Sequence, residues 1–111
     1  MNATLSALAE PNRLQIVELL RDAPRPVGDI AKRLRLRQPQ VSKHLRVLSE
    51  AGLVEVRPVA QKRIYQLRAE PFDELDKWLE SFRRAMEDRY DRLDELVSER
   101  KRRKGERRHG D

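Results

Sequence analysis

The side chains best suited to chemistry in this chain lie close together, within residues 38–46. Gln can form a pair of hydrogen bonds with adenine, Lys and Arg can contact guanine or a phosphate, and a small Ser permits close approach to a base. The stretch contains Gln38, Gln40, Ser42, Lys43 and Arg46. This combination favours recognition of base edges in a nucleic acid.

Catalysis and metal binding find little support in the same sequence. The chain has no Cys and only two His, so it predicts no disulfide, no thiolate metal site and no thiol nucleophile. No Ser or acidic residue has a His neighbour in a plausible catalytic arrangement, which argues against an enzyme. We therefore expect no cofactor, no metal site and no catalytic residues.

Hydrophobic spacing predicts the helices that position the polar stretch. A short first helix is expected before Glu10, and further helices over 11–22, 27–34 and 39–51, with Pro11 and Pro39 in first turns and Gly52 as a left-handed terminator. The broad buried stripe of the second helix consists of Leu14, Ile16, Val17, Leu19 and Leu20. Two helices thus flank a turn of four to five residues.

The helix over 39–51 is expected to turn Val41, Leu45 and Leu48 inward and its polar residues toward a major groove. Arg37 adds positive charge beside the groove but stands where a capping Ser is common, so Gln38 or water is expected to cap the helix. His44 is interpreted as a partly buried structural residue or a phosphate contact rather than a metal ligand.

After Gly52 the apolar period changes from 3.6 to 2, which predicts a β-hairpin. The expected strands are 53–57 and 64–67, with a basic, polar tip over 58–62. Gln61, Lys62 and Arg63 are placed to reach the flanking backbone or minor groove of DNA. A short helix, turn, helix and hairpin together predict a winged helix-turn-helix.

From Phe72 onward the spacing becomes helical again and remains so for about 40 Å, at 1.5 Å per residue. The preceding helices are too few to cover so long an apolar stripe, so a second copy of the chain is favoured over an intramolecular core as its cover. The stripe consists of Phe72, Leu75, Trp78, Leu79, Phe82, Met86, Tyr90, Leu93 and Val97.

Charge is unevenly distributed along the 111 residues, whose net charge is +6. Residues 1–71 hold 13 basic and 7 acidic residues, residues 72–99 hold 5 and 10, and residues 100–111 hold 7 and 2. We expect one domain over 1–99 and a basic, flexible tail over 100–111 that is disordered or a frayed helix end. No membrane-spanning segment or secretory signal is predicted, which favours a cytoplasmic protein without a membrane partner.

Three motifs carry a family resemblance: LAEPNR at 8–13, QPQVSKHLRVL at 38–48 and AGLV at 51–54. With them the chain resembles the ArsR/SmtB family of bacterial winged-helix repressors over residues 5–97. The resemblance implies a homodimer joined through the first helix, with Leu5 and Leu8, and the last helix. It also implies binding to a partly palindromic operator in double-stranded DNA and repression of transcription.

Departures from the family pattern indicate a branch that does not sense metals. Residues 27–31 lack a Cys-x-Cys pair, and no His occurs between Phe72 and Val97. Carboxylates alone favour hard oxygen sites rather than sites for zinc-like metals. The apolar residues Trp78, Phe82 and Met86 could bind an unknown small-molecule inducer. The alternative is that they only pack against the second copy of the dimer.

The predicted fold class is mostly α with a β-hairpin, a winged helix-turn-helix with a long C-terminal dimerisation helix. The predicted function is a homodimeric, sequence-specific repressor. The alternative is an architectural or RNA-binding winged-helix protein without sequence preference, for which salt alone would set the affinity.

Overall fold

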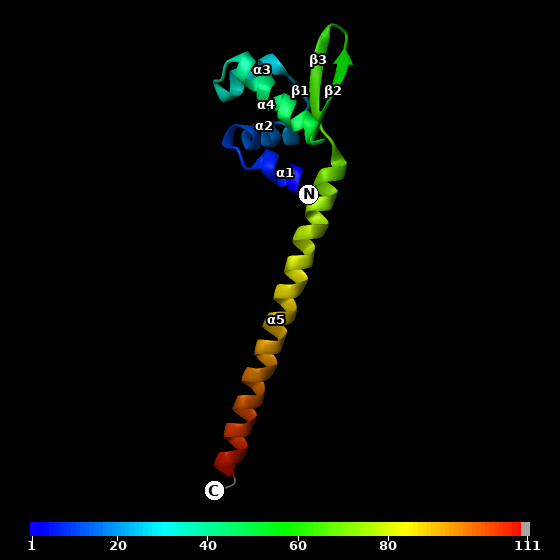
Figure 1. Cartoon of the computed structure of the whole chain (residues 1–111). Coiled ribbons are helices and arrows are strands. Elements are labelled where there is room, and N and C mark those ends of the chain that lie inside the picture. Colours follow the sequence, from blue (N-terminus) through cyan, green and yellow to red (C-terminus); the bar gives the residue numbers. More distant parts are fainter. Residues whose placement is uncertain (110–111) are drawn as a thin grey trace. The chain divides into compact units, whose positions relative to one another are not determined.

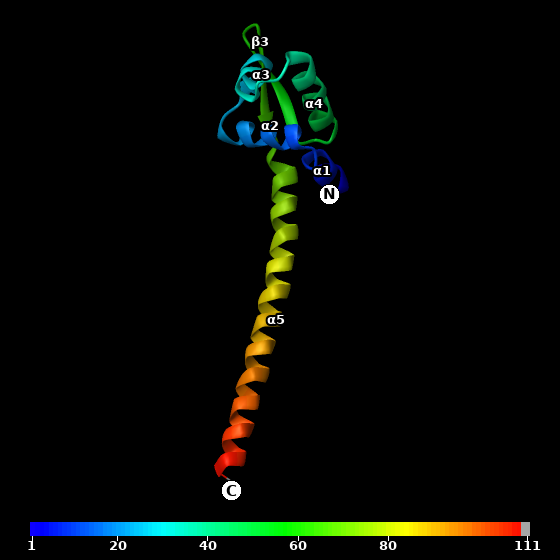
Figure 2. The same ribbon diagram turned by 90° about the vertical axis from the view of Figure 1, so that its left-hand side faces the viewer.

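A computed structural model describes the backbone of residues 1–109 and the side chains of residues 1–103. The chain divides into two compact units, residues 1–75 and 76–111, which are described separately (Figures 1 and 2). The elements are α1 (Asn2–Leu8), α2 (Pro11–Asp22), β1 (Arg25–Pro26), α3 (Val27–Leu34), α4 (Gln38–Glu50), β2 (Val54–Val59), β3 (Lys62–Leu67) and α5 (Ala69–His109). This order confirms the predicted fold class of a winged helix-turn-helix with a long C-terminal helix.

The junction between α1 and α2 explains the LAEPNR motif. Glu10 is the N-cap of α2, where its Oε2 accepts a hydrogen bond from the backbone N–H of Arg13 at 2.8 Å. Pro11 occupies the first helical position, which needs no N–H donor. The Arg13 side chain donates from Nε to the carbonyl oxygen of Ala7 at 2.7 Å and thereby caps the end of α1. The predicted start of the second helix at Pro11 is confirmed.

One hydrophobic core lies in the first unit. Its largest fully buried side chains come from α2, α3, α4 and the segment that enters β2: Ile16, Ile30, Val41, Leu45, Leu48 and Leu53. The expectation that Leu14 belongs to this core is wrong, because 42% of its surface is exposed. Ile16, Val17 and Leu20 form the buried stripe of α2, with Leu19 partly buried against it.

The sheet is antiparallel and has the order β1-β3-β2. The third strand, β1, was not predicted; it pairs Arg25 with Tyr65 and Pro26 with Ile64. The predicted five-residue hairpin tip is also wrong, because Pro58 pairs with Arg63 and Val59 with Lys62. Only Ala60 and Gln61 connect the strands, and Ala60 has a left-handed φ of 56°.

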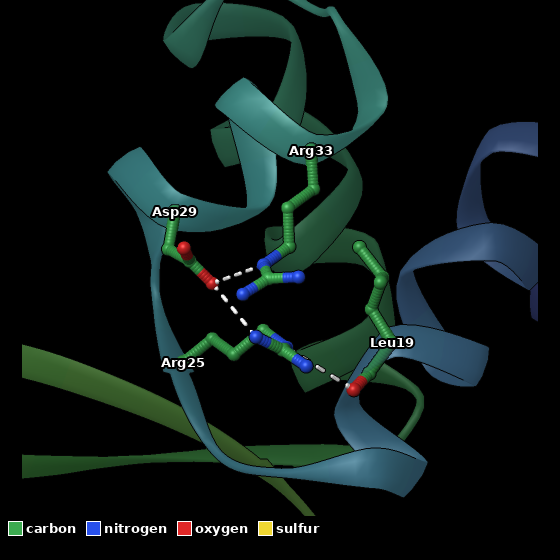
Figure 3. A network of polar contacts seen from close by, with 4 residues as sticks. All are labelled: Leu19, Arg25, Asp29 and Arg33. Atoms are coloured by element: carbon green, nitrogen blue, oxygen red, sulfur yellow. Dashed lines mark hydrogen bonds and ion pairs between the residues drawn. The ribbon is translucent and has the colours of Figure 1, made fainter.

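A charged network fixes α3 in place (Figure 3). Asp29 Oδ2 lies 3.0 Å from Arg25 Nη1 and 3.0 Å from Arg33 Nε. Arg25 also donates from Nε to the carbonyl oxygen of Leu19 at 3.3 Å. The hydrogen bond from Arg25, with help from Arg33, holds the pKa of the Asp29 carboxyl below its ordinary value. The network thus joins the end of α2, β1 and the first turn of α3.

The second unit is the continuation of α5. Its apolar side chains remain exposed, and Trp78 contacts Phe82 edge-to-face with ring centroids 4.9 Å apart. Glu80 forms ion pairs with Arg83 and Arg84, with N–O distances of 3.5 and 3.6 Å.

α5 is helical across the predicted boundary at 99/100, and Gly110 and Asp111 of the predicted tail lie outside the described residues. Within the described part of the chain, no helix is long and apolar enough to cross a membrane.

Candidate nucleic-acid interface

The turn between α3 and α4 places the two helices of the motif against each other. α3 ends at Arg35, which has left-handed φ and ψ of 56° and 41° and donates its N–H toward the last turn of α3. The N–H of Leu36 then bonds to the carbonyl oxygen of Ala31 at 3.0 Å. These bonds satisfy carbonyl groups that a helix end leaves unpaired. α4 begins at Gln38 and contacts α3, α2 and β2 (Figure 2).

α4 separates an apolar inner face from a polar outer face. Val41, Leu45 and Leu48 are fully buried in the core. All five side chains of the predicted base-reading set are exposed, namely Gln38, Gln40, Ser42, Lys43 and Arg46. Arg46 is held by an ion pair of 3.2 Å with Glu50 one turn later. Contact between this outer face and DNA stays a prediction.

Gln40 caps one backbone N–H at the N-terminus of α4. The backbone N–H of Arg37 donates to Gln40 Oε1 at 3.2 Å, which is half of a capping box. Gln38 lies instead beside α3, since a Cβ placed on Gly28 would come within 3.3 Å of Gln38 Nε2. At the Arg37 N–H the cap is therefore Gln40 and not Gln38, whereas a cap by water stays a prediction.

His44 lies on the side of α4 that faces the α1–α2 junction. Its Nδ1 is 3.7 Å from Glu10 Oε2, and both side chains are partly buried. Partial desolvation raises the pKa of Glu10, but backbone N–H donors from Arg13 and Asn12, with His44 and Arg13 nearby, outweigh it and hold that pKa below its ordinary value. His44 is partly buried as predicted, and a DNA contact by it stays a prediction.

The wing, defined here as β2, β3 and their connection, presents Gln61, Lys62 and Arg63 on its exposed end. The register adds a basic residue that sequence reasoning missed. Arg57 is exposed and lies two residues before Val59, which pairs with Lys62, so Arg57 and Lys62 share one face of the sheet. Alternation along β2 could have identified Arg57 from the sequence, had the strand been extended to Val59.

The residues predicted to form a dimer interface fall into two groups. Leu8 and Phe72 are partly buried against the core of their own chain, and Leu75 is also partly buried. The others have between 36% and 66% of their surface exposed: Leu5, Trp78, Leu79, Phe82, Met86, Tyr90, Leu93 and Val97. Over the described residues 78–97, α5 therefore carries a stripe of exposed apolar side chains.

Known proteins share this arrangement. A model of the helix-turn-helix domain family matches residues 8–57. A solved structure from Mycobacterium bovis, described as the homodimeric winged helix-turn-helix DNA-binding domain of Mb0332, a possible ArsR-family transcriptional regulator, is 30% identical to this chain. The match has a TM-score of 0.62 and covers 73% of this chain and 75% of that one. The chain belongs to the ArsR family.

Curated relatives of this chain are named as transcriptional regulators. The transcriptional regulator Rv2034 of Mycobacterium tuberculosis is 48% identical over 61 residues, which cover 55% of this chain and 57% of Rv2034. The transcriptional repressor SdpR of Bacillus subtilis is 28% identical over 82 residues, covering 74% of this chain and 91% of SdpR. The chain thus spans little more than half of the length of Rv2034. This ArsR-family chain has, within its described residues, no group of three or more His, Cys, Asp or Glu that could hold a metal ion.

Proposed function

We propose that this ArsR-family chain is a homodimeric repressor that binds a partly palindromic operator in double-stranded DNA. The observation that carries the proposal is the two-faced character of α4. Its inner residues Val41, Leu45 and Leu48 are fully buried, while the hydrogen-bonding residues of its outer face are exposed. Such a helix is anchored firmly enough to present its outer face to a major groove.

The wing supports the proposal from the other side of the motif. Arg57 and Lys62 share a face of the sheet, and Arg63 is exposed on the opposite face. Basic side chains on a β-ribbon can contact phosphates flanking the groove that the recognition helix enters. We assign α4 to base recognition and the wing to backbone contacts that fix its register.

The apolar stripe of α5 supports a homodimer. Exposed Phe82, Met86 and Leu93 repeat along one helix, and apolar stripes of this length are typical of protein interfaces. The homodimer of Mb0332 provides a precedent in the same family. A two-fold symmetric dimer would bind two half-sites related by the same symmetry, hence the palindrome. The repressor role rests on likeness to SdpR, which is named as a repressor.

Binding-site selection with the full chain tests the proposal. Random double-stranded DNA is enriched on the purified protein, and we expect a short sequence whose two halves are inverted repeats. The same site upstream of a promoter should reduce transcription in vitro when the protein is added. Equal affinity for all DNA, or preference for RNA, would replace this proposal with the architectural or RNA-binding alternative.

Two substitutions separate recognition of bases from recognition of backbone. Ser42→Ala, on α4, should cost about 1–3 kcal/mol on the selected site with little change on random DNA. Lys62→Ala, on the wing, should weaken binding to both DNAs alike. Equal effects of the two substitutions on both DNAs would contradict the assignment of α4 to bases.

A further inference from the structure

Gln40 has a role at the start of α4 that limits how it can contact DNA. The N-cap residue is Arg37, whose guanidinium group only donates hydrogen bonds and cannot accept one from the backbone. Gln40 supplies the reciprocal half of the capping box, because its Oε1 accepts a hydrogen bond from the backbone N–H of Arg37 at 3.2 Å. The carbonyl end of the Gln40 amide is therefore directed at the helix.

This contact also fixes which end of the amide faces outward. The partner is a backbone N–H, which can only donate, so the atom that lies against it must be oxygen. In a planar carboxamide the oxygen and the nitrogen diverge from one carbon, and turning the oxygen to the backbone leaves the NH₂ group as the outer end. The side chain is exposed in the first turn of α4, where recognition helices contact bases.

We propose that Gln40 is a specificity-determining residue that reads a hydrogen-bond acceptor, preferably guanine, rather than pairing with adenine. The inference rests on the proposed binding of DNA by α4. Pairing with adenine uses both ends of the amide, one accepting from N6 and one donating to N7. Gln40 would have to abandon the Arg37 N–H to do this. A donor alone suits guanine best, because guanine offers two acceptors, O6 and N7, whereas adenine N7 and thymine O4 offer one each and cytosine offers only an N4 donor.

Gln40→Glu is the variant that separates the two roles of this side chain. A carboxylate still accepts the Arg37 N–H, and its negative charge is favourable at a helix N-terminus. Its outer end is now an acceptor, which suits the N4 donor of cytosine. Gln40→Ala removes both ends. Gln15→Glu is the matched control, because Gln15 is an exposed residue of α2 and the charge change is the same.

The experiment is binding-site selection with the full-length wild type and these three variants, followed by affinity measurements on single-base variants of the selected site. We expect guanine at one position of each half-site in the wild type. Gln40→Glu should change that position toward cytosine by about tenfold or more in relative affinity and leave the other positions unchanged. Gln40→Ala should lose preference there, and Gln15→Glu should select the wild-type sequence.

Amide hydrogen exchange gives a second readout in the absence of DNA. The Arg37 N–H should stay protected in Gln40→Glu and lose protection in Gln40→Ala, whereas Gln15→Glu should not change it. The inference is overturned if the wild type selects adenine at the position that Gln40→Glu alters, or if Gln40→Glu weakens all positions evenly or alters none. If the wild type selects no sequence at all, the proposed function itself fails, and this inference fails with it.

Discussion

Residues 1–75 and residues 76–103 use apolar side chains in different ways. In the first unit Ile16, Ile30 and Leu48 are completely buried by their own chain. Along the second, the large apolar residues have between 39% and 66% of their surface exposed, although they repeat at the same helical spacing. Hydrophobic spacing thus identifies which face of a helix is apolar, but it does not identify what covers that face. We therefore expect substitutions in the first unit to change its stability and substitutions in the second unit to change dimerisation.

The largest effect is expected from charges placed on the stripe of α5. Phe82→Asp combined with Leu93→Asp would bury two carboxylates wherever two copies pack together, at a cost of several kcal/mol. The variant should be monomeric in analytical ultracentrifugation at micromolar concentration. Its circular dichroism spectrum should still show helix, because the first unit stays folded. Glu87→Gln combined with Asp91→Asn, on the same helix, is the control and should remain dimeric. A wild-type protein that sediments as a monomer would contradict the interface.

A smaller loss is expected from truncating a core residue, and it should have a different signature. Leu48→Ala removes a fully buried side chain and should lower the free energy of unfolding by about 2–5 kcal/mol at any protein concentration. Leu96→Ala, in the second unit, should instead lower the midpoint denaturant concentration by an amount that depends on protein concentration. Denaturant melts at two concentrations check both. Identical behaviour of the two variants would remove the distinction between the regions.

The basic end of the chain should affect DNA binding without affecting sequence preference. Residues 100–111 contain seven basic residues, and each phosphate they neutralise adds nearly one unit to the slope of log affinity against log salt. Deleting them should flatten the slope by several units and leave the selected site and the dimer unchanged. Replacing residues 100–103 (Arg-Lys-Arg-Arg) with Gln keeps the length and should produce part of the effect. An unchanged slope would indicate that these residues pair with acidic residues such as Asp88 and Asp91 instead.

The smallest effect concerns acid stability. The pKa of Asp29 is lowered in the folded chain, so its contribution is complete above the pKa of an unfolded Asp and is lost as pH falls through that value and then the folded one. The melting temperature of the wild type should therefore fall further between pH 7 and pH 3 than the melting temperature of Asp29→Asn. Asp22→Asn, at the exposed pair with Arg21, is the control and should behave as wild type. Equal acid sensitivity of wild type and Asp29→Asn would show that the network is not important for stability.

The sequence predicts the helices well because proline and glycine mark their ends. Pro11 and Pro39 fall in first turns, and Gly52 takes the left-handed φ of 78° that was expected after α4. The buried residues of α4 follow from their spacing alone. These features are local, so a single stretch of sequence contains what is needed to predict them.

The features that sequence reasoning missed depend on residues distant along the chain. The strand β1 has two residues, one of them Pro26, and exists only because β3 pairs with it some 40 residues later. Leu14 fits the helical stripe, yet no other element covers it fully. The cap by Gln40 belongs to the capping-box pattern, but Arg37 at the N-cap lacks the Ser or Thr side chain that marks this pattern in a sequence. Which residues read bases stays a prediction from side-chain chemistry.

The place of Pro58 in the sheet has a consequence for how the protein behaves in concentrated solution. β2 is an edge strand, and it exposes Val56 and Val59. An open edge with exposed valines is the kind of surface on which strands from other molecules add and aggregates grow. Pro58 has no N–H to offer such a strand, and edge strands are where proline is tolerated in a sheet. Pro58→Val would lengthen the edge to which another strand can bind and should promote aggregation. Pro58 therefore protects this edge, and the basic residues around it remain available for DNA.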